Sequence, residues 1–281
     1  MAAGVLLLQR VLADRQSEDT LDALRASAES YLQTDPSGTE TETMDDPSGT
    51  EETDASDMPS PTDPPATPAP TSSPEPTPEP LENPYQDSFL ANADMAAWLV
   101  VPDTPIDYPV MWTPRDENYY LYRDFKGRDS QNGSLILDTD SCVDPMTTNL
   151  IIHGHNMKSG AMFGDLDKYE DENYYREHRE MQLYTEDGLH TYEVIAIFRS
   201  QVFKKTDQVF KYYQFFQADT QEEFDDFYKN IKALSLYDTG VTASFGDHFL
   251  TLSTCTYHVD HGRFVVVARE IGCETTYAPF R

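Results

Sequence analysis

The chain has 281 residues and a formal net charge of −30. A chain this acidic has no basic stripe to neutralise phosphate backbones, which argues against nucleic acid as a partner. Its three cysteines are too few for a disulfide framework.

The first 34 residues predict a partial membrane anchor followed by a short helix. The apolar run Ala2 to Leu8 is broken by Gln9 and Arg10, whereas about 20 apolar residues are needed to span a bilayer. The run also lacks the basic start of a secretory signal peptide. We interpret it as the outer end of a membrane helix whose beginning is missing. The next stretch, Asp14 to Gln33, predicts an amphipathic helix whose apolar face is formed by Leu21, Leu24, Ala28 and Leu32.

Residues 35 to 82 predict a disordered spacer. They contain 13 Asp or Glu, no Lys or Arg, and 12 of the chain's 19 prolines. Such a segment buries too little apolar surface to offset the entropy lost on ordering, and its like charges repel one another. We therefore expect a single folded domain at residues 83 to 281.

The sequence of the folded domain predicts short strands with a few helices. A helix is expected at residues 86 to 97, and one or two more at 162–169 and 172–178. Apolar or alternating runs predict strands at 98–101, 106–112, 133–138, 150–153, 181–184, 191–200 and 264–268, together with one that Cys255 closes. Short strands and frequent turns favour a mixed, mostly antiparallel closed sheet.

A long insertion, residues 201 to 247, precedes the strand that ends at Cys255. Thr220 and Glu223 form the capping-box pattern, which predicts the start of a helix. Its buried face is expected to contain Phe224, Phe227, Ile231 and Leu234.

Cys255 and Arg263 are candidates for nucleophilic chemistry. Cys255 closes the apolar run that starts at Phe249, and the next strand begins after Arg263, so the two residues are expected at facing strand ends. A nearby cation favours the thiolate, and a positive group can stabilise the oxyanion formed when a thiolate attacks a carbonyl. Arg263 is suited to both tasks, whereas a buried structural thiol is the alternative interpretation of Cys255.

The histidines offer a base and, alternatively, a metal site. His153 and His155 alternate along a strand, but Gly154 is expected to end it and release His155. His258 and His261 lie in the turn after Cys255, and with the first two they provide ligand types that suit zinc. A metal-dependent hydrolase therefore remains an alternative, and so does a solvated connecting turn.

Several motifs, taken together, resemble the class B sortases, which are Gram-positive cysteine transpeptidases. The pattern Thr251-Leu252-Ser253-Thr254-Cys255 with Arg263 on the next strand is similar to the sortase active-site strands, and Gly154-His155-Asn156-Met157 is similar to a class B segment. Further similar segments occur in the family's order, at residues 106–110, 120–121, 124–125, 133–138 and 162–166. The resemblance covers roughly residues 86 to 272.

The resemblance implies an eight-stranded sortase barrel with an N-terminal helix and a long helix-containing insertion before the cysteine strand. It implies Cys255 as nucleophile, His155 as general acid and base, and Arg263 as the group that binds the substrate carbonyl and oxyanion. By motif position, a peptide pocket would include Thr254, Ser253, His153, Tyr120 and Leu121. The class often has asparagine four residues before Leu121, where this chain has Glu117.

The implied reaction cleaves a sorting signal after threonine and transfers the acyl group to a peptidoglycan amine at the cell surface. The implied partners are that peptide, that amine and the membrane that the N-terminus would reach, and thiolate acyl transfer needs no cofactor. A non-catalytic surface module is a second alternative. An extracellular location would allow Cys142 and Cys273 to pair, although the sequence does not show that they come within bridging distance.

Overall fold

The computed structural model describes residues 2–34, 82–256 and 259–277. The described residues, apart from Thr34, belong to one compact unit. The predicted spacer, apart from Glu82, lies outside the described residues. The described part of the chain contains, in chain order, α1 (Ala2–Thr34), α2 (Gln86–Ala91), β1 (Met95–Val100), β2 (Asp107–Met111), β3 (Leu135–Leu137), β4 (Asn149–Gly154), η1 (Leu166–Glu170), α3 (Glu172–Glu177), β5 (Glu180–Tyr184), β6 (Gly188–Gln201), η2 (Tyr212–Gln214), α4 (Gln221–Leu234), β7 (Phe249–Cys255) and β8 (Gly262–Thr276).

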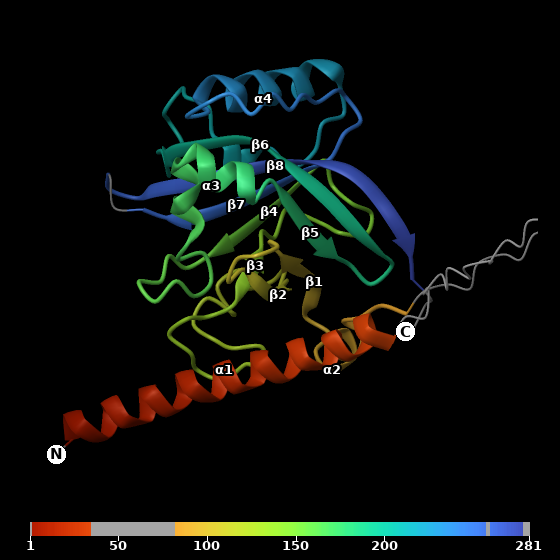
Figure 1. The fold of residues 1–281 in the computed structure, drawn as a ribbon. Helices are drawn as coiled ribbons and strands as arrows, with labels where there is room; N and C mark the ends of the chain where they lie inside the picture. The colour runs from red at the N-terminus through yellow and green to blue at the C-terminus, as the bar shows by residue number, and fades with distance from the viewer. Residues whose placement is uncertain (1, 35–81, 257–258, 278–281) are drawn as a thin grey trace, which may run out of the picture. The chain divides into compact units, whose positions relative to one another are not determined.

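The eight strands close into a barrel (Figure 1). Around it they follow the order β1, β2, β3, β4, β7, β8, β6, β5, and β5 pairs with β1 to complete the ring. The pairs β2–β3 and β4–β7 are parallel, while the other pairs are antiparallel. This confirms the predicted mixed, mostly antiparallel closed sheet.

Alternation along the strands divides the apolar side chains between the barrel interior and its outer faces. In β7, Leu250 and Leu252 belong to the interior cluster, whereas Phe249 belongs to a second cluster under α4. In β8, Val266 lies in the interior cluster, while Val265 and Val267 lie under α4. Because successive strand residues point to opposite faces, β7 and β8 each contribute to both clusters.

The insertion helix α4 begins as its sequence predicts. Thr220 Oγ1 accepts a hydrogen bond from the backbone N–H of Glu223, and the Glu223 side chain accepts one from the Thr220 N–H, which completes the capping box. Phe224, Phe227 and Ile231 are buried against the barrel. Leu234 is 44% exposed, so the predicted apolar face ends one turn earlier than expected.

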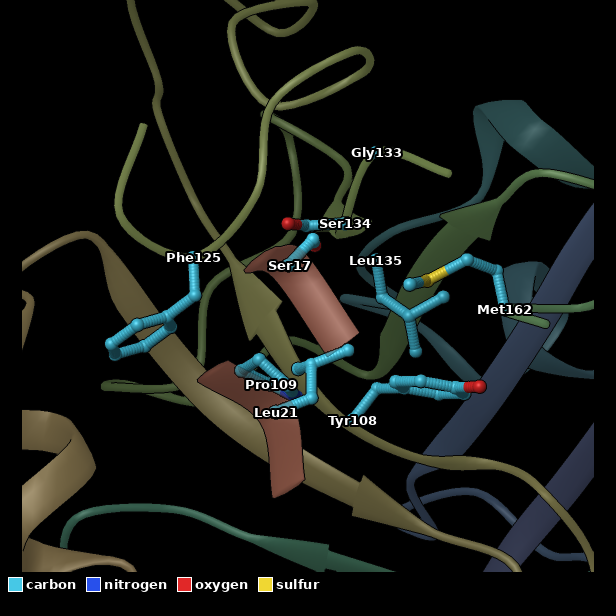
Figure 2. A pocket seen from close by; sticks show the side chains of 9 residues that line it. All are labelled: Ser17, Leu21, Tyr108, Pro109, Phe125, Gly133, Ser134, Leu135 and Met162. Atoms are coloured by element: carbon cyan, nitrogen blue, oxygen red, sulfur yellow. The ribbon is translucent and has the colours of Figure 1, made fainter. Parts of the chain in front are cut away.

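Helix α1 is longer than the predicted helix, and its second half packs on the barrel. Leu21 and Ala28 are buried, but Leu32 is 57% exposed, so the prediction for Leu32 was wrong. Figure 2 shows Leu21 beside Tyr108 in a small pocket between α1 and the barrel, which is also lined by Ser17, Pro109, Phe125, Gly133, Ser134, Leu135 and Met162. Within the described residues, no helix has a long enough apolar stretch to cross a bilayer.

Two predictions about segment ends were wrong. The helix expected at residues 86 to 97 ends at Ala91, because the Asn92 side chain accepts a hydrogen bond from the Asp94 N–H and turns the chain into β1. The last strand extends to Thr276, so Cys273 lies within β8 rather than after it. Cys142 and Cys273 are not joined by a disulfide.

Candidate active site

Three neighbouring strands bring the predicted catalytic residues to the same end of the barrel. Cys255 is paired directly with Arg263 across the antiparallel strands β7 and β8. On the other side of β7, Thr254 is paired with Gly154 of the parallel strand β4. His155 and Cys255 each follow a member of that pair, so a histidine, a cysteine and an arginine lie at adjacent strand ends.

Cys255 lies where β7 emerges from the protein interior. The six preceding residues of the strand are buried, whereas Cys255 is exposed. Its carbonyl oxygen accepts a hydrogen bond of 2.9 Å from the Asn156 side-chain amide, next to His155. The backbone around the thiol is therefore fixed to β4, while the thiol itself is open to a reactant.

His155 is held by the loop between β2 and β3. Its Nε2 lies 2.7 Å from the carbonyl oxygen of Leu121. The ring of Tyr122, which is 61% exposed, lies 5.1 Å from the imidazole between centroids. Backbone and aromatic contacts from one loop thus set the position of the imidazole.

Two glycines allow the chain segments around His155 to approach one another closely. Gly133 has a φ of 62°, and a Cβ there would lie 2.2 Å from the Leu121 carbonyl oxygen. A Cβ on Gly154 would lie 2.6 Å from side-chain atoms of Leu135 and of Phe163. Any larger residue at either position would have to displace a neighbour of His155.

Arg263 is half-buried at the start of β8. One guanidinium nitrogen, Nη1, donates a hydrogen bond of 3.1 Å to the Gly262 carbonyl oxygen. Because an arginine has five N–H donors, donors remain for a ligand oxygen beside Cys255.

Comparison with known proteins identifies this arrangement. A family model for the sortase domain matches residues 99–271. The chain belongs to the sortase family. It is 37% identical over 177 residues to sortase B of Listeria monocytogenes. This alignment covers 62% of this chain and 69% of the relative.

Solved structures place this sortase in class B. Sortase B from Bacillus anthracis in complex with AAEK1 matches with a TM-score of 0.58 at 32% identity, covering 66% of this chain and 83% of that one. Clostridium perfringens sortase B matches with a TM-score of 0.59 at 28% identity, covering 66% and 99%. Sortases are cysteine transpeptidases that act on sorting-signal substrates at the cell surface, and the barrel has the architecture that the resemblance implied.

Two predicted substrate-binding residues of this sortase are buried in the cysteine strand. Ser253 and Thr254 are each only 1% exposed. The Thr254 hydroxyl donates to the Gly154 carbonyl oxygen at 2.8 Å, and the Ser253 hydroxyl lies 2.7 Å from the Tyr212 hydroxyl. These hydroxyls are therefore paired in the interior, and the contact of Ser253 and Thr254 with a peptide stays a prediction.

Tyr212 was not identified from the sequence. It lies in η2, 41 positions before Ser253 along the chain, and it is buried. Burial raises the pKa of Tyr212 to about 12, an effect that the nearby Ser253 hydroxyl and Arg263 charge oppose. The sequence of the insertion gives no pattern that would predict this contact.

Tyr120, another predicted pocket residue, is also buried. It is 3% exposed, and its hydroxyl donates to an Asp94 carboxylate oxygen at 2.9 Å and accepts from the Asn92 amide at 3.0 Å. Burial raises its pKa to about 12. Tyr120 therefore anchors the loop, and its neighbour Leu121 is half-buried. The contact of both residues with a peptide stays a prediction.

The metal-ligating side chains that converge in the described residues differ from those predicted. Ligand atoms of Glu117, Asp138 and His153 lie within 4.8 Å of one another. His155 is not a member of this group, and His261, which is exposed, is not either. His258 lies outside the described residues. Of the four histidines in the metal-dependent hydrolase alternative, His153 is the one that belongs to this group in the described part of the chain.

Proposed function

We propose that Cys255 is the nucleophile of this sortase. Its thiolate would attack the carbonyl carbon of threonine in a sorting signal, before a glycine or asparagine, and form a tetrahedral intermediate. Collapse of the intermediate breaks the peptide C–N bond and leaves a thioacyl enzyme. The observation that carries this proposal is the direct pairing of Cys255 with Arg263, with His155 at the adjacent end of β4.

His155 is proposed to transfer the protons in both half-reactions. A carbonyl oxygen can only accept, so the contact with Leu121 requires the proton of a neutral imidazole to be on Nε2. Nδ1 then exchanges protons with the reactants. When protonated, it gives its proton to the leaving amine, and it later removes one from the incoming amine.

Arg263 is proposed to bind the threonine carbonyl oxygen and to stabilise its negative charge in the tetrahedral intermediate. The guanidinium is fixed at the turn by its bond to the Gly262 carbonyl oxygen. Its pairing position opposite Cys255 supports this role, because the negative charge develops on the oxygen bonded to the carbon that the thiolate attacks.

The peptide is proposed to lie beside Leu121, Tyr122 and His153. Leu121 and His153 are half-buried, and Tyr122 is exposed against His155. Tyr120, Ser253 and Thr254, the other residues of the predicted pocket, are buried. The pocket would also contain Glu117, which gives it an acidic side chain where the class often has asparagine.

The acceptor is proposed to be a peptidoglycan amine, which would attack the thioester, release the Cys255 thiolate and anchor the substrate protein to the wall. Residues 83–281 would be the catalytic domain and residues 35–82 an acidic spacer. The predicted N-terminal membrane anchor stays a prediction. The chemistry assigned to Cys255, His155 and Arg263 uses no cofactor.

The test is cleavage of quenched sorting-signal peptides by the full chain. Cys255→Ala is expected to abolish cleavage and to prevent formation of a thioacyl adduct, detected by intact mass. Cys142→Ala is the matched control, because Cys142 is a half-buried cysteine in the loop between β3 and β4. Retention of most of the activity by Cys255→Ala would refute the assignment of the nucleophile.

A further inference from the structure

Glu117, Asp138 and His153 form a cluster of ligand-type side chains that the proposed transfer reaction does not use for chemistry. Their ligand atoms all lie within 4.8 Å of one another. One is an imidazole nitrogen and two are carboxylate oxygens, and they come from three separate segments of the chain. This is a mixed donor set rather than a patch of surface carboxylates.

Two of the three side chains are positioned by the barrel itself. His153 lies in β4 and pairs with Ile136 of β3, and Asp138 follows β3 directly. The Asp138 N–H donates to the Ile151 carbonyl oxygen at 2.8 Å, which fixes the backbone at that position. As a result, His153 Nε2 and Asp138 Oδ2 lie 2.9 Å apart. Rigid strand ends therefore pre-position two donors before any ligand arrives.

Glu117 supplies the third donor from the loop between β2 and β3. It is exposed, and within the described part of the chain its carboxylate has neither a hydrogen bond nor an ion pair. Neighbouring ligands of a tetrahedral zinc ion lie about 3.3 Å apart, given metal–ligand bonds of about 2.0–2.1 Å. The imidazole and the Asp138 carboxylate are already close to that spacing, so only the exposed Glu117 side chain must move inward.

We propose that Glu117, Asp138 and His153 bind a divalent transition-metal ion of the zinc class. An imidazole nitrogen favours zinc and its neighbours over magnesium and calcium, which prefer oxygen ligands alone. Three protein ligands leave a fourth tetrahedral position for water or for a ligand atom from outside. The ion would replace the hydrogen atom shared between His153 Nε2 and Asp138 Oδ2. The neutral imidazole would then bind the ion through the Nε2 lone pair and carry its proton on Nδ1.

The experiment is a metal titration of the full chain in a Cys255→Ala, Cys273→Ala background, which removes the two exposed cysteines as competing ligands. Binding of Zn²⁺ is measured by calorimetry, and binding of Co²⁺ by its visible absorption. We expect about one ion per chain and a tetrahedral Co²⁺ spectrum. Glu117→Gln and His153→Ala should each weaken binding at least about tenfold.

Asp140→Asn is the matched control, because Asp140 is an exposed carboxylate two residues from Asp138 and is not a member of the cluster. It should bind zinc as the background protein does. Glu117→Gln changes an exposed side chain, so loss of binding in it does not reflect unfolding. Absence of stoichiometric binding, or equal binding by Glu117→Gln and Asp140→Asn, would overturn the proposal. The outcome does not depend on peptide cleavage.

Discussion

The Nε2 atom of His155 and the carbonyl oxygen of Leu121 are 2.7 Å apart. The carbonyl can occupy this position because the neighbouring residue, Gly133, has a positive φ and no side chain that would contact it. The geometry of the proposed acid and base therefore depends on a glycine that lies against the Leu121 carbonyl.

Gly133→Ala is expected to lower kcat/KM by about 10- to 100-fold, because displacing a reacting group by about 1 Å can have an effect of that size. The added Cβ would lie 2.2 Å from the Leu121 oxygen and push it away. Gly240→Ala is the control, since Gly240 also has positive φ, but a Cβ added there would have no other atom within 4 Å. Peptide cleavage by the two folded variants is compared. Equal kcat/KM values would mean that the Leu121 carbonyl does not position His155.

Arg263→Lys is expected to lower kcat by about 100- to 1,000-fold, because a lysine keeps the charge but not the planar set of donors aimed at the oxyanion. Arg269→Lys on the same strand is the control. Arg269 pairs with Phe249 at the far end of β7 and lies 3.6 Å from an Asp247 carboxylate oxygen. Single-turnover formation of the thioacyl adduct measures the step directly. Similar rates for the two variants would remove Arg263 from the mechanism.

Tyr212→Phe is expected to lower the free energy of unfolding by about 1–3 kcal/mol, since it leaves the buried Ser253 hydroxyl without its partner. Burial raises the pKa of Tyr212 to about 12, so the phenol is neutral throughout the working pH range. The pH profile of cleavage should therefore keep its shape while the maximum rate falls. Tyr213→Phe, whose hydroxyl bonds to Phe203 instead, is the control. A changed pH profile in Tyr212→Phe alone would contradict this assignment.

Arg25→Gln is expected to destabilise the protein more at about pH 7 than at about pH 3.5. Arg25 of α1 donates to the Asp107 carbonyl oxygen at 2.6 and 3.0 Å, and it lies 3.3 Å from the Asp107 carboxylate. Burial raises the pKa of Asp107 and Arg25 opposes that rise, so ionisation of Asp107 already disfavours the folded state. Removal of Arg25 increases this penalty as the pH rises through the folded-state pKa. Below about pH 3.9, the pKa of an aspartate in the unfolded chain, the Asp107 carboxyl is neutral in the folded and unfolded states. There, Arg25→Gln removes only the hydrogen bonds to the Asp107 carbonyl oxygen.

Urea denaturation of the full chain at the two pH values measures this difference. Arg15→Gln is the control, because Arg15 is exposed on the same helix. An effect of Arg25→Gln that is equal at both pH values would show that the ion pair contributes nothing to the docking of α1.

The barrel and the ends of its catalytic strands could be predicted because their causes are local in the sequence. Alternating apolar runs predict strands, the capping box at Thr220 predicts the start of α4, and the motifs around His155 and Cys255 are contiguous. The contact of Tyr212 with Ser253 could not be predicted in this way, since it joins residues far apart in the sequence. For the same reason, the motif position of Tyr120 did not indicate that its ring faces inward.

The strands that lead to His155 and Cys255 are parallel neighbours, and this has a consequence for how the enzyme matures. Parallel strands cannot form as a local hairpin, because the chain must cross over between them. The bond from Thr254 to Gly154 spans 100 positions, and contacts so distant in sequence slow folding. Contacts that are distant in sequence therefore bring Cys255 and His155 to neighbouring strand ends. The rate of peptide turnover by this sortase would consequently measure the fraction of molecules that are fully folded, whereas the helix content of the sample would not.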